Sequence, residues 1–538
     1  MQLFHLPIIV HKKMAEKVNE VAPVLNDEHL QRDYGTLFNP NSIDSNQVQL
    51  RYPKAVIFVL LSKLLESFVA NGVRTVFVTY LHNSLNFSQE SATNYFHIFN
   101  FFGQLCPIFG AIVADNYLGN VKTIFYLFFL YATGWIAMSI LTFPLSLASA
   151  TSIPLIITAL IVIAIGNGSI RACVTSLGGA QFVLPRQSRD LDRYFSHYYF
   201  VYTLGILLSK IIPPEIEKRT HCFGKTECYS AVFGSLGVVF LAAWLVFLLG
   251  MSLYKREVVA ESTNNLLFQV FGCIYAGVKH KLKNVRHHTW IDGTKDQYTT
   301  RFIEDVCTVL KVLKLFIPLP MYWALYAQID STWTFQSSQM NTTVFGYPIA
   351  SDEAKAAAPF LLLILIPIWE KLNPLIRAIN IEISPLKSMA MGGLSAALSF
   401  FCAAILQLYI ESHTSTDNSR LSIFWQIPQF LLLMFGEVWL SIPGLNFSFT
   451  QSPPSMRSVM MAAWFCNNAF GNLIVILINE IRPFQLYSCV YFLYGSLMFI
   501  SVITFSWLAR YYHYVNYNEF HKSDQNANVV RRSSIVSI

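Results

Sequence analysis

Charged residues are scarce in this chain of 538 residues, because Asp, Glu, Lys and Arg together make up only 13% of it. A soluble globular protein carries about 25%, so the composition excludes a soluble enzyme. The net charge of +7 is modest and gives no sign of a nucleic-acid partner. No nucleophile–base set, phosphate-binding loop or Cys/His spacing typical of zinc occurs, so we expect no enzyme activity, cofactor or metal site.

Long polar stretches are also few, and hydrophobic residues make up 54% of the sequence. Mostly apolar runs lie at residues 56–81, 95–117, 122–147, 153–177, 194–213, 229–253, 306–328, 354–370, 386–411, 422–447, 457–479 and 484–509. A run of about 20 apolar residues is long enough to cross a bilayer as a helix. We therefore predict an all-α membrane protein with twelve transmembrane helices in two six-helix bundles.

A long basic segment in the middle of the chain separates the first six runs from the last six. We predict a cytoplasmic N-terminal tail, an N-terminal bundle, a cytoplasmic linker, a C-terminal bundle and a cytoplasmic C-terminal tail at residues 1–52, 53–254, 255–305, 306–511 and 512–538. Lys and Arg concentrate in the segments placed inside, as the positive-inside rule requires.

Two kinds of modification are predicted in the loops placed outside. The glycosylation sequons at Asn86 and Asn341 both fall in such loops. Cys222 and Cys228 lie in the polar loop after the fifth run. If that loop is extracellular, a disulfide between them is expected.

Glu437 is the only charged residue between Leu421 and Met456. A carboxylate in the hydrocarbon region costs several kcal/mol unless it faces protein or a water-filled cavity. Several other runs also hold charged side chains. The sequence therefore predicts a membrane-spanning structure with a polar interior, which is typical of transport proteins.

Local sequence then carries a family resemblance. The segment GAIVADNYLGNVK, between the second and third runs, resembles the major facilitator signature. Segments such as ESFVANGVRTVFVTYL, GNGSIRACVTSLGGAQF and IPQFLLLMFGEVWLSIPGLNFSFTQSPPSMRSVMMAAW resemble the proton-dependent oligopeptide transporters, the POT or PTR family, and such segments run from about residue 55 to 510. The resemblance implies a plasma-membrane protein with the major facilitator fold, which carries di- and tripeptides or related small zwitterions with protons by alternating access.

A zwitterionic peptide needs an anion for its ammonium, a cation for its carboxylate and aromatic walls for its side chains. The resemblance implies that Glu437 binds the ammonium and that Arg74 and Arg171 bind the carboxylate. It implies further cavity-lining positions at Tyr80, Tyr199, Trp323, Ser441 and Trp464.

The resemblance also implies roles in coupling and gating. Protons, the only coupling ions expected, would bind at Glu66, His97 and Glu437. Lys311 and Glu370 match a gating pair of opposite charges, and Asp115 and Lys122 match positions that hold the cytoplasmic loop geometry.

The first run departs from the family pattern Glu-x-x-Glu-Arg, since it contains Lys63, Glu66 and Ser67. Lys63 and Glu66 share a helix face, and a cation there favours the ionised carboxylate. Gln104, Thr203, Ala327 and Ala358 also replace polar or aromatic residues of the family. Two alternatives to proton symport therefore stay open: a facilitator with an altered substrate and weak or absent proton coupling, and a transport-inactive membrane receptor or scaffold.

Overall fold

The structure is a computed structural model. It describes residues 50–142, 152–220, 228–255, 266–283, 297–344, 347–348, 353–378, 383–413, 421–481, 484 and 486–515. These residues are almost entirely helical. The predicted tails at 1–52 and 512–538 lie outside the described residues except at their inner edges.

Helices follow one another with short connections. The helices before the central segment are α3 (Ala55–Asn83), α4 (Gln89–Leu105), α5 (Pro107–Val113), the π-helical turn η2 (Ala114–Leu118), α6 (Gly119–Leu141), α7 (Ser152–Ala180), α8 (Ser188–Arg219) and α9 (Tyr229–Gly250). The central segment contains α10 (Leu266–Lys283).

The second series begins with a broken helix. Its elements are α11 (Thr300–Phe316), α12 (Pro320–Ala327), η4 (Gln328–Asp330), α13 (Thr332–Ser338), the paired two-residue strands β1 (Thr343–Val344) and β2 (Tyr347–Pro348), η5 (Glu353–Ala356), α14 (Ala357–Ala378), α15 (Pro385–His413), η6 (Ile423–Gln426), α16 (Ile427–Thr450), η7 (Pro454–Met456), α17 (Arg457–Ile481) and α18 (Tyr487–Arg510).

Nine helical stretches within the described ranges are long and apolar enough to cross a membrane. One of them, Ile98–Leu141, is 44 residues long and covers two of the predicted runs. The other two runs lie in α8, which carries charges at both ends, and in the pair α11 and α12, where the helix breaks before Pro320. The twelve predicted crossings are therefore all accounted for by helices.

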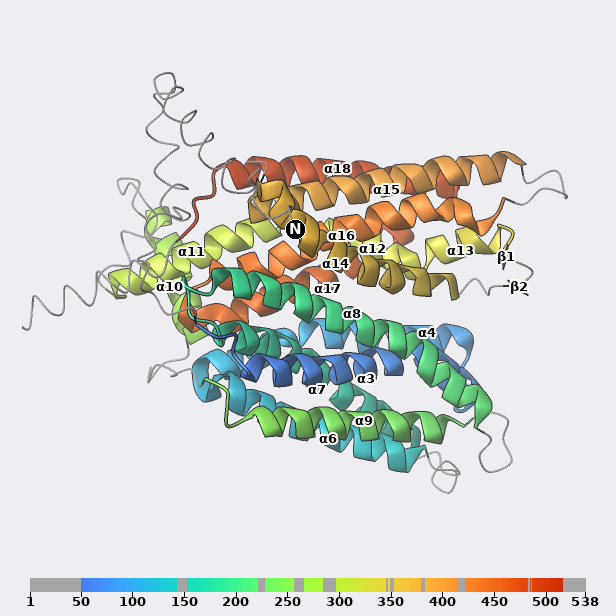
Figure 1. Cartoon of the computed structure of the whole chain (residues 1–538), viewed down its shortest axis with the longest axis horizontal. Helices are drawn as coiled ribbons and strands as arrows, with labels where there is room; N and C mark the ends of the chain where they lie inside the picture. The colour runs from blue at the N-terminus through green and yellow to red at the C-terminus, as the bar shows by residue number, and fades with distance from the viewer. Residues whose placement is uncertain are drawn as a thin grey trace, which may run out of the picture. The chain divides into compact units, whose positions relative to one another are not determined.

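The helices from Tyr52 to Ile538 form one packed unit. Within it, α3 packs against α8 and α9, and α15 packs against α16 and α18; Figure 1 shows α15 and α18 side by side. Helices of the two predicted bundles also meet, since α8 contacts α14 and α16, and α17 contacts α5 and α7. The predicted domain boundaries at 53–254 and 306–511 stay a prediction.

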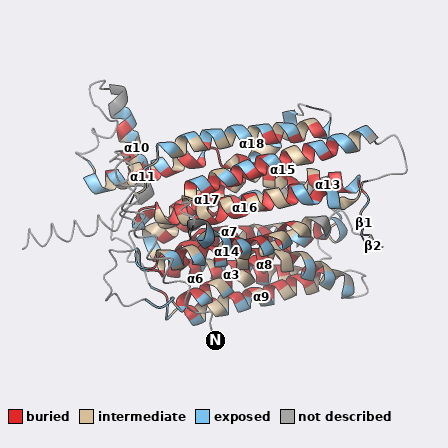
Figure 2. Cartoon of the chain, turned by 45° about the horizontal axis from the view of Figure 1, so that its top comes forward, coloured by how far each residue is buried: buried red, intermediate tan, exposed pale blue. Residues whose placement is uncertain are grey.

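Large apolar side chains lie on the outside of the packed unit. Along α9, the side chains of Val238, Leu241, Leu245 and Leu249 are exposed by 67%, 47%, 58% and 61%. Their spacing puts them on one face of the helix. Figure 2 shows that exposed and buried residues alternate along α9 and α18. A continuous apolar outer face is suited to lipid.

Glycines allow α7 to approach the helices that precede it. A Cβ placed on Gly110 would lie 2.1 Å from the Ser169 carbonyl oxygen, and one on Gly168 would lie 2.4 Å from the Gly103 carbonyl oxygen. Both obstacles are backbone, which cannot rotate away. Small residues at such crossings are typical of membrane helices, and this crossing positions Arg171, one turn beyond Gly168.

We expect Gly110→Ala to destabilise the protein by about 1–3 kcal/mol, because its methyl group would overpack the crossing and displace α7. The measurement is the apparent melting temperature of the purified protein in detergent. Gly234→Ala in α9 is the matched control, since nothing lies within 4 Å of the Cβ position there. Equal melting temperatures for the two variants would contradict this account of the crossing.

Candidate functional site

Glu437 lies in the middle of α16 and is 3% exposed. Its Oε1 accepts a short hydrogen bond from the Tyr199 hydroxyl of α8. Its Oε2 is buried and accepts no hydrogen bond of normal geometry from the described residues, although the Tyr326 hydroxyl of α12 lies nearby. A buried carboxylate oxygen without a donor is costly, so this oxygen is suited to accept from a ligand.

Arg171 lies in α7 and is 6% exposed. Its Nη1 donates to Gln104 Oε1 of α4 at 3.0 Å. The centre of its guanidinium lies 5.5 Å from the ring of Phe465 on α17, a distance at which a cation is attracted by an aromatic face. Its Nε is buried and has no hydrogen-bond partner among the described residues. Arg171 is therefore held by Gln104 and Phe465, while its buried Nε donor is unused.

Arg74 lies in α3 and has more unused donors. Its Nη1 donates to Asn71 Oδ1 at 3.3 Å, whereas Nε and Nη2 are buried and lack partners in the described part of the chain. A Cβ on Gly103 would lie 3.7 Å from Nη2. Because Gly103 is next to Gln104, Arg74 and Arg171 reach the same turn of α4. Two guanidinium groups near one turn, with free N–H donors, form an arrangement that suits a carboxylate.

The structure confirms the contact between Lys63 and Glu66 that their spacing predicts. Lys63 Nζ lies 2.6 Å from Glu66 Oε2, and both side chains are 3% exposed. The Lys63 ammonium also lies 5.8 and 5.3 Å from the ring centres of Tyr198 and Tyr202 on α8. The Lys63 ammonium thus contacts both the Glu66 carboxylate and two aromatic rings of α8, at the contact of α3 with α8.

The predicted lining residues do not all gather at Glu437. Ser441 is buried one turn after Glu437 on α16, beside the Tyr199 hydroxyl. Trp323 on α12 contacts the rings of Tyr322 and Tyr326. Tyr80 instead packs 5.3 and 4.9 Å from the rings of Tyr229 and Phe233 on α9. Tyr80 therefore faces the contact between α3 and α9.

Trp464 lies against a position with no room for a side chain. A Cβ on Gly444 of α16 would lie 2.0 Å from the Trp464 ring. The same ring lies 5.6 Å from that of Phe316 on α11. Trp464 thus connects α17 with both α11 and α16, and it is only 2% exposed.

The expected pairing of Lys311 with Glu370 is not found. Glu370 Oε1 of α14 lies 3.7 Å from His197 Nε2 of α8, and among the described residues no ion pair joins Glu370 to Lys311. The two lysines of α11, Lys311 and Lys314, point instead into a cavity beside α18. The side that a charge faces depends on how its helix is rotated, which the sequence motif does not reveal.

Asp115 makes a contact between the two series of helices. Its Oδ2 accepts from the backbone N–H of Val459, in the first turn of α17, at 2.9 Å. The first N–H groups of a helix lack partners within it, and their positive end attracts a carboxylate. Lys122 is exposed near the start of α6, so Asp115, rather than Lys122, forms the inter-series contact.

Two further contacts between the two series of helices were not predicted from the sequence. Ser458 Oγ donates to Asn120 Oδ1 at 3.0 Å, and Asn446 Nδ2 donates to Asp192 Oδ1 at 2.6 Å. Asn120 lies inside the motif GNVK at the start of α6, and its amide side chain is the available signal in the sequence. Together with Asp115, these contacts connect the two series near the start of α6 and α17.

Several predicted residues lie where less can be described. His97 belongs to α4, but its side chain lies outside the described residues. Cys228 is disulfide-bonded, whereas Cys222 also lies outside the described residues. Asn86 and Asn341 are both exposed, so both sequons stay predictions.

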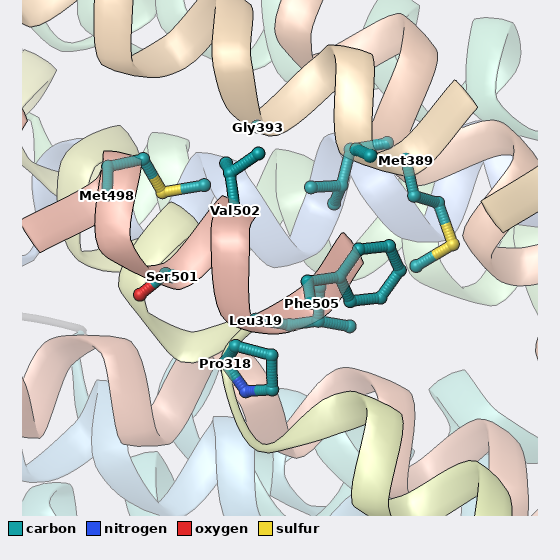
Figure 3. Close-up of a pocket in the computed structure, with 10 residues that line it drawn as sticks. Pro318, Leu319, Met389, Gly393, Met498, Ser501, Val502 and Phe505 are labelled. Atoms are coloured by element: carbon teal, nitrogen blue, oxygen red, sulfur yellow. The ribbon is translucent and has the colours of Figure 1, made fainter. Parts of the chain in front are cut away.

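Glu437 lines neither of the two cavities found among the described residues. The first, about 10 Å³, lies among Pro318, Leu319, Met389, Gly393, Met498 and Phe505; Figure 3 shows Met498 and Val502 directed toward Gly393. It is almost wholly apolar and has room for about one water, so it cannot hold a zwitterion. The second, about 370 Å³, is lined by Lys311 and Lys314.

The cavity predicted around Glu437, Arg74 and Arg171 stays a prediction. No group of three or more potential metal ligands occurs in the described ranges.

Comparison with known proteins then identifies the family. The sequence profile of the POT family matches residues 121–482, which is more than half of the chain. The chain belongs to the POT family. "Peptide transporter family 1" of Drosophila melanogaster is 25% identical over 89% of this chain and 90% of its own length. Human "Solute carrier family 15 member 2" is 32% identical over 73% of this chain.

The solved structures agree with this membership. The crystal structure of the POT family transporter PepTSo covers 86% of this chain and 98% of its own, with a TM-score of 0.63 and 24% identity. This POT family member therefore has the predicted fold of twelve membrane helices in two bundles, and it is an integral multi-pass membrane protein. It spans only 54% of the length of the human relative.

Proposed function

We propose that this POT family member is a plasma-membrane transporter that carries di- and tripeptides, or related small zwitterions, together with protons by alternating access. The peptide ammonium binds Glu437 of α16. The peptide carboxylate binds Arg74 of α3 and Arg171 of α7. Binding to both series of helices couples the peptide to their relative movement.

The observation that carries this proposal is the set of buried charged atoms without partners. Arg74 Nε and Nη2, Arg171 Nε and Glu437 Oε2 are all buried, and none has a hydrogen-bond partner of normal geometry among the described residues. Buried charged groups are costly unless they are satisfied. Cations on one series and an anion on the other match the two ends of a peptide, which would satisfy both.

One observation favours the facilitator as the second candidate. The buried Lys63–Glu66 ion pair, at 2.6 Å, places a fixed cation beside Glu66. The family resemblance implies that the Glu66 carboxylate takes part in proton coupling. An internal ammonium can balance the Glu66 charge without a proton. Glu437 then remains as the carboxylate on which coupling depends.

Uptake by the purified full chain in proteoliposomes separates these functions. We expect a labelled dipeptide to accumulate above equilibrium when the outside is acidic, and to accumulate much less without the pH gradient. Equal uptake with and without the gradient would support the facilitator. If no zwitterion enters, the receptor or scaffold is supported.

Alternating access also predicts an effect at the contact between Asp192 of α8 and Asn446 of α16. Asn446→Asp keeps the side-chain shape but sets two carboxylates at the present hydrogen-bond distance of 2.6 Å. We expect the repulsion between these carboxylates to favour the state in which α8 and α16 are separated at this contact, by about tenfold. The measurement is the distance distribution between spin labels at the exposed positions 122 and 387, in a background without reactive cysteines.

The matched control exchanges the two residues, as Asp192→Asn with Asn446→Asp. This double variant places an amide opposite a carboxylate again and keeps the net charge of the wild type. We expect its distance distribution to return to that of the wild type. A single variant that leaves the distances unchanged would show that this contact does not hold the end closed.

A further inference from the structure

The larger of the two cavities lies between α11 and the end of α18, and Glu437 is not among its lining residues. It has a volume of about 370 Å³ and is lined by Lys311, Lys314, Leu315, Trp507, Leu508, Tyr511 and Tyr512. Small-molecule pockets in proteins begin at about 300 Å³. The cavity is therefore large enough for a small anionic group.

Both lysines of this cavity are exposed and could contact an anion. Lys311 and Lys314 are three residues apart, so they lie on one face of α11, and both are exposed. Neither forms an ion pair with any residue in the described ranges, and Glu370 lies beside His197. Two ammonium groups on one wall repel each other unless an anion lies between them.

The facing wall is aromatic. Trp507 and Tyr511, one turn apart at the end of α18, are 56% and 70% exposed, with ring centres 5.6 Å apart. The next residue, Tyr512, donates to Gln451 Oε1 at 3.0 Å, which fixes this end of the chain against α16. Trp and Tyr are enriched where membrane helices meet the headgroup region. Leu315 and Leu508 add apolar surface beside the charges.

We propose that this cavity binds the phosphate of an anionic lipid headgroup, with Lys311 and Lys314 on the phosphate and Trp507 and Tyr511 at the level of the glycerol backbone. The predicted topology places the end of α18 at the cytoplasmic surface, where anionic lipids concentrate and basic pockets between helices recognise their headgroups. The shared chemistry is a phosphate group, which a soluble phosphate would also supply.

The test uses the full chain, purified in detergent and titrated with short-chain phosphatidylinositol phosphate, short-chain phosphatidylcholine or inorganic phosphate. Melting temperature reports binding, because a ligand of the folded state raises it. We expect phosphatidylinositol phosphate to raise it and phosphatidylcholine to leave it unchanged. An equal rise with inorganic phosphate assigns the site to soluble phosphates, which retains the cation site and removes the lipid.

Variants identify the cavity as the site. Lys311→Gln with Lys314→Gln is expected to weaken binding about 30-fold, whereas Lys311→Arg with Lys314→Arg keeps it. The matched control is Lys371→Gln with Lys387→Gln, which removes two exposed lysines outside the cavity. The proposal is overturned if none of the three compounds raises the melting temperature, or if the control pair weakens binding as much as the cavity pair.

Discussion

Uptake of a dipeptide by Glu437→Gln is expected to fall about 100-fold, equivalent to about 3 kcal/mol. The amide keeps the shape of the side chain, and its oxygen can still accept from the Tyr199 hydroxyl, which now bonds to Oε1. What it loses is the negative charge opposite the peptide ammonium. The measurement is uptake against peptide concentration in proteoliposomes, with protein amount and orientation matched to the wild type.

Two comparisons separate binding from a structural role. Tyr199→Phe removes the hydroxyl bond and keeps the carboxylate, so a purely structural Glu437 predicts equal losses for the two variants. An N-acetylated dipeptide has no ammonium, so its weak uptake should be the same in the wild type and in Glu437→Gln. A Glu437→Gln protein that transports the free dipeptide normally would remove Glu437 from the site.

The fold follows from the sequence because lipid demands long apolar helices. The runs at 194–213 and 306–328 are helical, although neither forms a helix apolar and unbroken enough to be recognised alone. The sequence predicts both as membrane crossings because each is a mostly apolar run. The helix α10 inside the basic linker was not predicted, since length and charge alone gave no boundary there.

The sequence predicts which residue types form the candidate site better than it predicts where each side chain points. A charge in a membrane helix predicts a polar surrounding, and the structure buries Glu437, Arg171 and Lys63. Which neighbour satisfies each charge depends on helix rotation and crossing. Gln104 was identified only as a replacement for a family Tyr, yet it accepts from Arg171 at 3.0 Å. Tyr80 matches a lining position but packs on α9.

The Lys63–Glu66 pair predicts how uptake depends on pH. In Lys63→Glu, two carboxylates lie three residues apart at a site where Lys63 is now 3% exposed. Like charges so close in a buried site cannot both stay ionised, so one of them takes up a proton. We expect transport by Lys63→Glu to rise steeply as pH falls, by up to about tenfold per pH unit, while the wild type shows a shallower profile.

Lys63→Arg is the matched control, because it retains a cation beside Glu66 and should keep the shallow profile, although its planar donors differ from an ammonium. The two variants are compared by initial dipeptide uptake at about pH 5.5 and about pH 7.5, with equal amounts of folded protein. Breaking a buried ion pair costs about 3–5 kcal/mol, so the melting temperature is measured at both pH values as well. Lys63→Glu should melt lower at the higher pH, where both carboxylates tend to ionise. A Lys63→Glu profile as shallow as that of Lys63→Arg would mean that Glu66 does not take part in proton movement.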